Sequence, residues 1–119
     1  MENNKLIKLT NQLLLVSDQI LQRFQQAKED GQSGDFYQEV MPFSDKVQDL
    51  VDQWWVEVDL WTKQHNQVNI KQLINTKDQL EKIAIQAFYP QTSRKNFLDM
   101  MNSITFVLNT ILDENKIDK

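Results

Sequence analysis

Histidine is the side chain best suited to catalysis or metal binding near neutral pH, and the chain contains one, His65. A zinc site takes three or more protein ligands, and the di-iron sites of helical bundles carry a Glu-x-x-His motif on each of two helices. Thr62 stands three residues before His65, so the sequence lacks this motif. A Ser–His–Asp triad meets the same shortage of histidine. We therefore expect the His65 ring to pack at a helix end and to hydrogen-bond outward, without a ligand role.

Other reactive groups are equally scarce. The sequence has no cysteine, which excludes disulfides, thiolate nucleophiles and iron–sulfur clusters. Both glycines lie in the segment 30–34 (DGQSG), which matches no phosphate-binding loop. We predict no catalytic residue, no metal ion and no cofactor.

Carboxylates are numerous, but their spacing indicates a surface. Four of them share one row of a helix, opposite the tryptophans: Asp45, Asp49, Asp52 and Asp59. Acid–base catalysis needs carboxylates placed within reach of a substrate, whereas a charged row along a helix is typical of a solvated face. The chain is therefore predicted not to be an enzyme.

Length and composition indicate one small soluble domain over residues 1–119. Of these residues 40% are hydrophobic and 25% charged, and only two are glycine and two proline, which favours a few long elements. The longest apolar run, Leu13–Val16, falls far short of the roughly 18 residues that cross a bilayer. The N-terminus lacks an apolar core of signal-peptide length, so we predict a cytoplasmic protein without a membrane partner. A net charge of −4 argues against nonspecific nucleic-acid binding.

Four stretches repeat their apolar residues at spacings of three and four, the pattern of an amphipathic helix. The predicted helices cover residues 4–29, 35–65, 70–88 and 93–113. Connections of about five residues make consecutive helices antiparallel neighbours. The predicted fold class is therefore all-α, an up-and-down antiparallel four-helix bundle.

Several residues mark the ends and interruptions of these helices. Asp35 and Asn69 are predicted N-caps. Pro42 falls inside the second helix and predicts a kink or a short break there. Ile70 begins the predicted buried stripe of the third helix, and the polar tail from Asn115 is expected to fray.

The segment 52–61 (DQWWVEVDLW) holds all three tryptophans. Its alternation of apolar and acidic residues is confined to Val56–Leu60, whereas the three–four spacing extends along the whole second helix, so the segment is predicted to be helical. Trp54 and Trp61 fall in the buried stripe. Trp55 projects about 100° away, and we expect it to cover the seam with a neighbouring helix.

Residues spread along the chain resemble those of a known family. They are Asp35-Phe36-Tyr37, Pro42, the region around Trp54, and Arg94–Phe97 (RKNF) ahead of the final helix. In these features the chain resembles the YppE-like proteins, small cytosolic proteins of bacteria that form a domain family of unknown function. The resemblance covers nearly the whole chain. It implies a four-helix up-and-down bundle and no catalytic residues.

Four apolar residues fall on faces that are otherwise polar. Val56 and Leu60 lie among the aspartates of the second helix, Phe106 lies opposite the apolar stripe of the fourth, and Leu15 is an outlier on the first. Scattered exposed hydrophobic residues are normal, so an ordinary surface is one interpretation. Aromatic residues are also enriched at interface centres. The second interpretation is a contact surface for a protein partner or for self-association.

Charge is unevenly distributed between the two middle helices. Residues 35–65 include seven acidic and two basic residues, whereas residues 69–95 include five basic and two acidic ones. This favours attraction between the second and third helices. It also predicts an acidic outer face that attracts a basic partner.

Arg94 and Lys95 lie in the first turn of the fourth helix, where free amides and the helix dipole favour an anion. An up-and-down bundle also brings carboxylates to that end, namely Glu29, Asp30, Asp35 and Glu39. The two bases are therefore expected either to pair with these carboxylates or to hold an anion. An anion or small molecule would lie near an aromatic cluster, Phe88, Tyr89 and Phe97.

These features predict a non-enzymatic helical bundle that binds a protein partner or itself, as an adaptor, a regulator or a homo-oligomer. The predicted contact is Val56, Leu60 and Phe106, with the acidic row setting the orientation. The alternative is a bundle that binds a small molecule or an anion at the Arg94 and Lys95 end.

Overall fold

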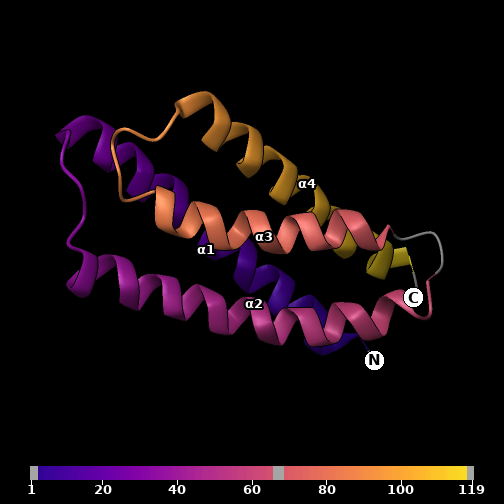
Figure 1. Cartoon of the computed structure of the whole chain (residues 1–119). Helices are drawn as coiled ribbons and strands as arrows, with labels where there is room; N and C mark the ends of the chain where they lie inside the picture. Colours follow the sequence, from indigo (N-terminus) through magenta and orange to yellow (C-terminus); the bar gives the residue numbers. More distant parts are fainter. Residues whose placement is uncertain (1–2, 66–68, 118–119) are drawn as a thin grey trace.

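A computed structural model describes residues 3–65 and 69–117, and within these residues all regular secondary structure is helical. The elements in chain order are α1 (Asn4–Asp30), a π-helical turn η1 (Phe36–Val40), α2 (Met41–Thr62), α3 (Ile70–Gln86) and α4 (Arg94–Ile117). Together they form an elongated bundle of 46 × 26 × 22 Å (Figure 1). The predicted all-α fold class is confirmed.

The four α-helices are arranged in a ring. Each packs beside the next in the chain, and α4 closes the ring against α1. α1 also touches α3 across the centre, whereas α2 and α4 occupy opposite corners (Figure 1). The start of α1, the end of α2, the start of α3 and the end of α4 lie at one end of the bundle (Figure 1). This is the up-and-down topology that the short connections predict.

The apolar stripes predicted for α1, α2 and α4 are buried together in one core. Near the end of the bundle that holds the α1–η1 connection, Phe24 of α1 stacks on Phe97 of α4. Their ring centroids are 3.9 Å apart and their planes differ by 10°. This stack joins the first and last helices through fully buried side chains.

Polar side chains cap two helix starts as predicted. Asp35 Oδ1 accepts a hydrogen bond of 2.8 Å from the Gln38 amide, and Asn69 Oδ1 accepts from the first amides of α3. α1 ends at Gly31, whose φ of 67° is left-handed and whose amide donates to the Ala27 carbonyl. Glycine adopts this conformation without the steric cost that a Cβ adds.

The entry to α2 takes a form that the sequence does not predict. Helical structure begins at Phe36, but the first turn is π-helical and the α-helix starts at Met41. The Val40 and Met41 amides donate to carbonyls five residues earlier. Pro42 then falls in the first turn of α2, where its missing N–H is tolerated. A continuous α-helix would press the proline ring against the carbonyl four residues earlier, and the wider turn relieves that contact.

Three helix ends differ from the prediction. α2 ends at Thr62, three residues before the predicted end, and α3 ends at Gln86, two residues before. α4 continues to Ile117, so Asn115 does not lie in a frayed tail. Asn115 is buried, and its Nδ2 donates to the Ile111 carbonyl at 2.7 Å. This bond pairs the Nδ2 donor of Asn115 within its own helix, so a polar residue is accommodated at a buried position near the end of α4.

The structure also corrects the buried stripe predicted for α3. Ile70 is exposed because it stands at the first position of the helix, above the point where the core begins. Leu73 and Leu80 are buried as predicted. Thr76 and Ile83 fill the places beside them, and the Thr76 hydroxyl is satisfied by the Gln72 carbonyl.

Candidate functional site

The outward face of α2 carries two of the four predicted surface residues. Val56 is 56% exposed and Leu60 is 53% exposed. They are four residues apart, so both side chains project from the same side of the helix. Trp54 and Val58 point the other way and are fully buried. The predicted exposure of Val56 and Leu60 is confirmed.

Carboxylates precede this apolar pair on the same face. Asp45, Asp49 and Asp52 are all exposed. Asp49 accepts a hydrogen bond from Gln53 and Asp52 accepts one from Gln48, so both carboxylates are held by neutral partners on their own helix. We refer to Asp45, Asp49, Asp52, Val56 and Leu60 as the α2 face.

Phe106 is also exposed as predicted, at 66%, but it lies elsewhere on the bundle. It projects from α4 on the side opposite the buried residues Ile104 and Leu108. Since α4 and α2 occupy opposite corners and these side chains project away from the core, Phe106 faces away from Val56 and Leu60. The predicted single contact of these three residues is therefore corrected to two separate surfaces.

Leu15, by contrast, lies on the same side of the molecule as part of the α2 face. It is 63% exposed and borders a groove of about 320 Å³ between α1 and α2. Asp49 and Lys46 of α2 line the same groove. The helix ring thus brings Leu15 beside the acidic half of the α2 face.

The tryptophans hold core positions as predicted. Trp54 is fully buried, and its Nε1 donates to Thr10 Oγ1 of α1 at 3.1 Å. Trp61 is buried, with the His65 ring 4.8 Å from its own. The ring packs at the helix end as expected, but His65 Nδ1 lies 2.9 Å from the Trp61 carbonyl, so this contact runs back to α2 and not outward. Trp55 is half-buried against the core, in agreement with the seam prediction.

A polar cluster links α2 and α3 through a neutral glutamine and an acidic residue. Glu81 accepts a hydrogen bond from Lys77 at 3.1 Å and another from Gln48 of α2 at 2.9 Å. The bond to Glu81 raises the pKa of Lys77 above its ordinary value of 10.5, and the charges of Asp52 and Asp78 add to the rise. The ion pair of this cluster lies within α3, and Asp52 of α2 is near enough to Lys77 to contribute to its pKa.

The expected pairing of Arg94 and Lys95 with carboxylates from the other helices is not seen among the described residues. Lys95 pairs with Asp99 of its own helix at 2.9 Å, and this hydrogen bond raises the pKa of Lys95. Arg94 points back to α1, where its guanidinium lies 5.9 Å from the Phe24 ring. Within the described residues neither base forms an ion pair with the four carboxylates expected to lie at that end. An i,i+4 partner on the same helix is closer to Lys95 than any of them.

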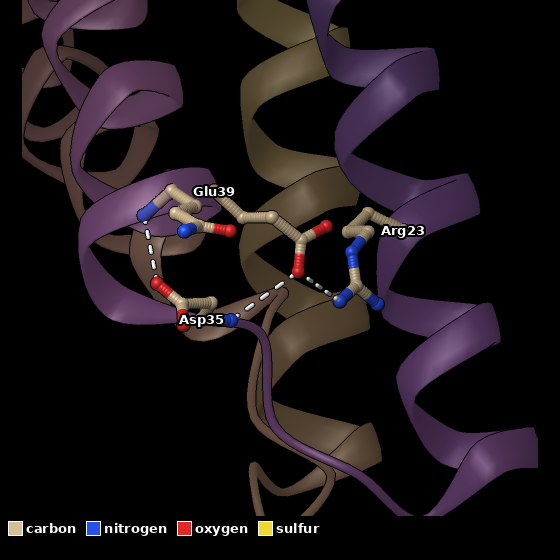
Figure 2. A network of polar contacts seen from close by, with 4 residues as sticks. Arg23, Asp35 and Glu39 are labelled. Atoms are coloured by element: carbon tan, nitrogen blue, oxygen red, sulfur yellow. Dashed lines mark hydrogen bonds and ion pairs between the residues drawn. The ribbon is translucent and has the colours of Figure 1, made fainter.

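Arg23 is the base that pairs with one of those carboxylates, Glu39 (Figure 2). Its Nη2 lies 3.4 Å from Glu39 Oε1, and the same oxygen accepts the Asp35 amide at 3.2 Å. The guanidinium also lies 4.8 Å from the centre of the Phe88 ring. Arg23 therefore ties α1 to the π-helical turn and to the end of α3.

The aromatic cluster suggested as an alternative ligand site is part of the packed core. Phe97 is stacked on Phe24, and Phe88 packs edge-on against Phe43 at 5.6 Å. Phe88 and Phe97 are buried and Tyr89 is half-buried. The Gly34 amide donates to the Phe88 carbonyl at 2.9 Å, which draws the α1–η1 connection over the cluster.

Residues 3–65 and 69–117 show neither a metal-binding group of side chains nor a membrane-spanning helix. In this part of the chain no three acidic or histidine side chains gather closely enough to hold a metal ion. None of its helices combines the length and apolar composition needed to cross a bilayer.

Residues 10–115 match the model of a family described as a bacterial domain of unknown function, DUF1798. The chain belongs to this family. The match agrees with the YppE-like resemblance of the sequence: the uncharacterised protein YppE of Bacillus subtilis (strain 168) is 23% identical over 117 residues. These residues cover 96% of the chain and 94% of YppE.

Solved structures of DUF1798 type share the fold. A Listeria innocua protein of unknown function matches with a TM-score of 0.90 and 24% identity, over 99% of this chain and 98% of that one. The crystal structure of B. subtilis YppE gives the same TM-score and coverage at 22% identity. The Staphylococcus aureus DUF1798 domain MW1337 gives 0.78 at 24% identity, over 91% and 93% of the two chains. These likenesses establish the four-helix architecture.

Three features of the DUF1798 bundle were missed from the sequence. Ile74 and Ile85 are exposed on α3, although both are strongly apolar. Arg23 was not singled out, because its partners lie 16 and 65 residues away. The Lys95–Asp99 pair, however, has the i,i+4 spacing of a helical ion pair and was visible in the sequence.

Proposed function

We propose that this chain is a non-enzymatic, cytoplasmic binding module that recognises a protein partner through the α2 face. The observation that carries the proposal is the exposed pair Val56 and Leu60 at the end of a row of exposed aspartates. Because each side chain is about half exposed, its burial in an interface would contribute about 1 kcal/mol.

The charge of the face favours a basic partner. α2 carries five acidic residues and one lysine, and of the acidic residues Glu57 pairs with Lys5 and Asp59 with Lys63. Carboxylates around an apolar centre orient a cationic partner and speed its encounter. A partner that fits is an amphipathic helix with an apolar stripe and flanking lysines or arginines. A second copy of the same acidic face fits less well, because like charges repel.

The groove beside Leu15 extends this surface toward α1. Its lining combines Leu15 and Leu50 with Lys46 and Asp49. A helix lying along α2 would reach both the groove and the apolar pair, because both border the outward side of α2.

The test is a comparison of three forms of the protein as bait in native cytosol. Wild type, Val56→Ser/Leu60→Ser and Phe106→Ser are first shown to share the same helical circular dichroism and melting temperature. Phe106→Ser is the matched control, since it removes an equally exposed hydrophobic residue from the opposite corner.

We expect a specific protein to be retained by wild type and Phe106→Ser and lost with the double variant. Retention should weaken as salt rises from about 50 to 500 mM, because exposed charges are screened. Retention by all three forms, or loss only with Phe106→Ser, would exclude the α2 face. Light scattering of the purified protein adds the self-association test: a doubled mass abolished by the double variant would assign the face to a homodimer.

A further inference from the structure

The outward side of α2 extends beyond the α2 face to the start of the helix. At about 100° per residue, Met41 falls in the same sector of roughly 100° as the five residues of the α2 face. Met41 is 40% exposed. This side of the helix therefore has an apolar residue at its start, an acidic row in its middle and the apolar pair Val56 and Leu60 near its end.

Two aromatic residues enlarge the apolar end at Met41. Phe36 is 51% exposed and Tyr37 is 76% exposed, and their rings meet edge-on with centroids 5.2 Å apart. The Met41 amide donates to the Phe36 carbonyl, five residues earlier, so the aromatic residues stand about one π turn before Met41. We refer to Phe36, Tyr37 and Met41 as the η1 patch.

The η1 patch and the apolar pair are too far apart for one side chain of a partner to contact both. From Met41 to Val56, α2 rises about 22 Å, and from Met41 to Leu60 about 28 Å. A partner that covers both apolar ends must therefore lie along α2. Its length matches a helix of about five turns.

The backbone of the partner favours a helix over an extended segment. Within the described residues all regular structure is helical, so the protein presents side chains and no strand edge to this partner. An extended segment would lay its N–H and C=O groups against α2 without partners, whereas a helix pairs its own. Helical segments that dock on apolar surfaces in this way present their contact residues at spacings of three and four.

The acidic row between the apolar ends determines the charge of the partner. Within residues 3–65 and 69–117, Asp45, Asp49 and Asp52 form no ion pair. Of the nearby lysines, Lys63 pairs with Asp59 and Lys77 pairs with Glu81. Lys46 lines the groove beside Asp49, so one lysine stands against three carboxylates. The row is complementary to lysine or arginine side chains.

The same row argues against a second copy of the chain as the occupant. An antiparallel pair of α2 helices would place each η1 patch on the apolar pair of the other copy. It would also bring the two acidic rows face to face, and like charges brought together in an interface repel. A basic partner obtains both apolar contacts without this repulsion.

On the basis of the function proposed for the α2 face, we propose that the η1 patch and the α2 face form one continuous docking strip. Its occupant is a helix of about five turns with apolar side chains toward both ends and lysines or arginines between them. The η1 patch receives one apolar end, Val56 and Leu60 receive the other, and the aspartates contact the basic middle.

The test uses designed peptides of about 22 residues with an alanine-based helical background, followed by fluorescence anisotropy. The long peptide carries two leucines toward each end and three lysines between them, all on one face and in symmetric order, so that it docks in either direction. The short peptide has glutamine in place of the leucines at one end. A third peptide has glutamate in place of the lysines.

Four forms of the protein are compared after circular dichroism and melting temperature show that they are folded alike. They are wild type, Tyr37→Ser/Met41→Ser, Val56→Ser/Leu60→Ser and the control Phe106→Ser. Should the first double variant fail to fold, Tyr37→Ser alone takes its place, because Tyr37 is the most exposed residue of the η1 patch.

We expect wild type and Phe106→Ser to bind the long peptide about tenfold more tightly than the short one, since a second apolar contact is buried. Tyr37→Ser/Met41→Ser should bind the long peptide only as tightly as wild type binds the short one, and Tyr37→Ser alone should lose about threefold. The glutamate peptide should bind wild type at least tenfold more weakly than the long peptide.

Equal affinity of wild type for the long and short peptides, no saturable binding of either, or equal affinity for the lysine and glutamate peptides would overturn the docking strip. The proposed function is judged separately. Loss of long-peptide affinity with Val56→Ser/Leu60→Ser but not with Tyr37→Ser/Met41→Ser would remove the η1 patch and keep the α2 face. Unchanged affinity in both double variants would remove both, and where no peptide binds, the bait comparison in native cytosol still decides the proposed function.

Discussion

The indole of Trp54 on α2 donates a hydrogen bond to the Thr10 hydroxyl on α1, with 3.1 Å between Nε1 and Oγ1 and both side chains fully buried. The bond crosses the α1–α2 interface. It fixes the relative positions of the two helices in a way that apolar packing alone does not, because only one alignment of the helices brings the two atoms together.

Thr10→Val should therefore destabilise the fold although it preserves the shape of the side chain. The change leaves the buried Trp54 donor without an acceptor, and the expected loss in the free energy of unfolding is about 1–3 kcal/mol. Urea unfolding followed by circular dichroism measures it. Thr10→Ser keeps the acceptor and should lose less, so a larger loss for Ser than for Val would contradict this account.

Gly34→Ala should destabilise the end of the bundle where η1 begins. An added Cβ would stand 2.7 Å from Phe88 Cδ1 and 3.2 Å from both Arg23 Nη2 and Glu39 Oε1. The overcrowding is expected to cost about 1–3 kcal/mol. Gly31→Asn is the comparison, because a side chain at Gly31 meets open space and asparagine tolerates the left-handed conformation. Thermal unfolding that ranked Gly31→Asn as the worse variant would refute the crowding at Gly34.

Asn115→Asp tests whether the end of α4 is packed. The substitution replaces the Nδ2 donor to the Ile111 carbonyl with a carboxylate oxygen and buries a charge, for an expected loss of about 1–3 kcal/mol at pH 7. Asn109→Asp makes the same change at an exposed position of α4 and should stay within about 0.5 kcal/mol of wild type. Equal stability of the two variants in urea would show that residue 115 contributes nothing to the core.

Lys77 should make unfolding depend on pH in the alkaline range. Its hydrogen bond to Glu81, with Asp52 and Asp78 nearby, raises its pKa in the folded state above 10.5. The stabilisation is complete below pH 10.5 and is lost as the pH rises through the folded-state value. Lys77→Met should lack this loss, so stability curves of wild type and variant should converge between about pH 10 and 12. Lys71→Met, an exposed change on the same helix, should leave the wild-type slope intact.

Helical periodicity predicted most of the fold because it depends on local geometry. The stripes of α1, α2 and α4 repeat at the helical period, and each became a buried surface. The caps at Asp35 and Asn69 were also predictable, since an N-cap bonds to amides only two or three residues away. The burial of Asn115 was not predicted, because it depends on how far α4 extends relative to the neighbouring helices.

The candidate site was predicted residue by residue but not as a surface. The helical wheel correctly placed Val56, Leu60, Phe106 and Leu15 outside the core. Which of them lie on the same side depends on the order of the helices around the ring, and Phe106 was separated from the others by that order. The position of Arg23 over Phe88 likewise depends on contact between distant segments.

The π-helical turn at Phe36–Val40 has a consequence for how chain length can vary in this fold. A π turn holds about one residue more than an α turn over nearly the same rotation. Loss of one residue from this turn would convert it to α-helix while Val47, Val51 and Trp54 kept their angular positions toward the core. The turn thus acts as a spacer, so insertions and deletions there change the path of the preceding connection and leave the bundle's side-chain register unchanged.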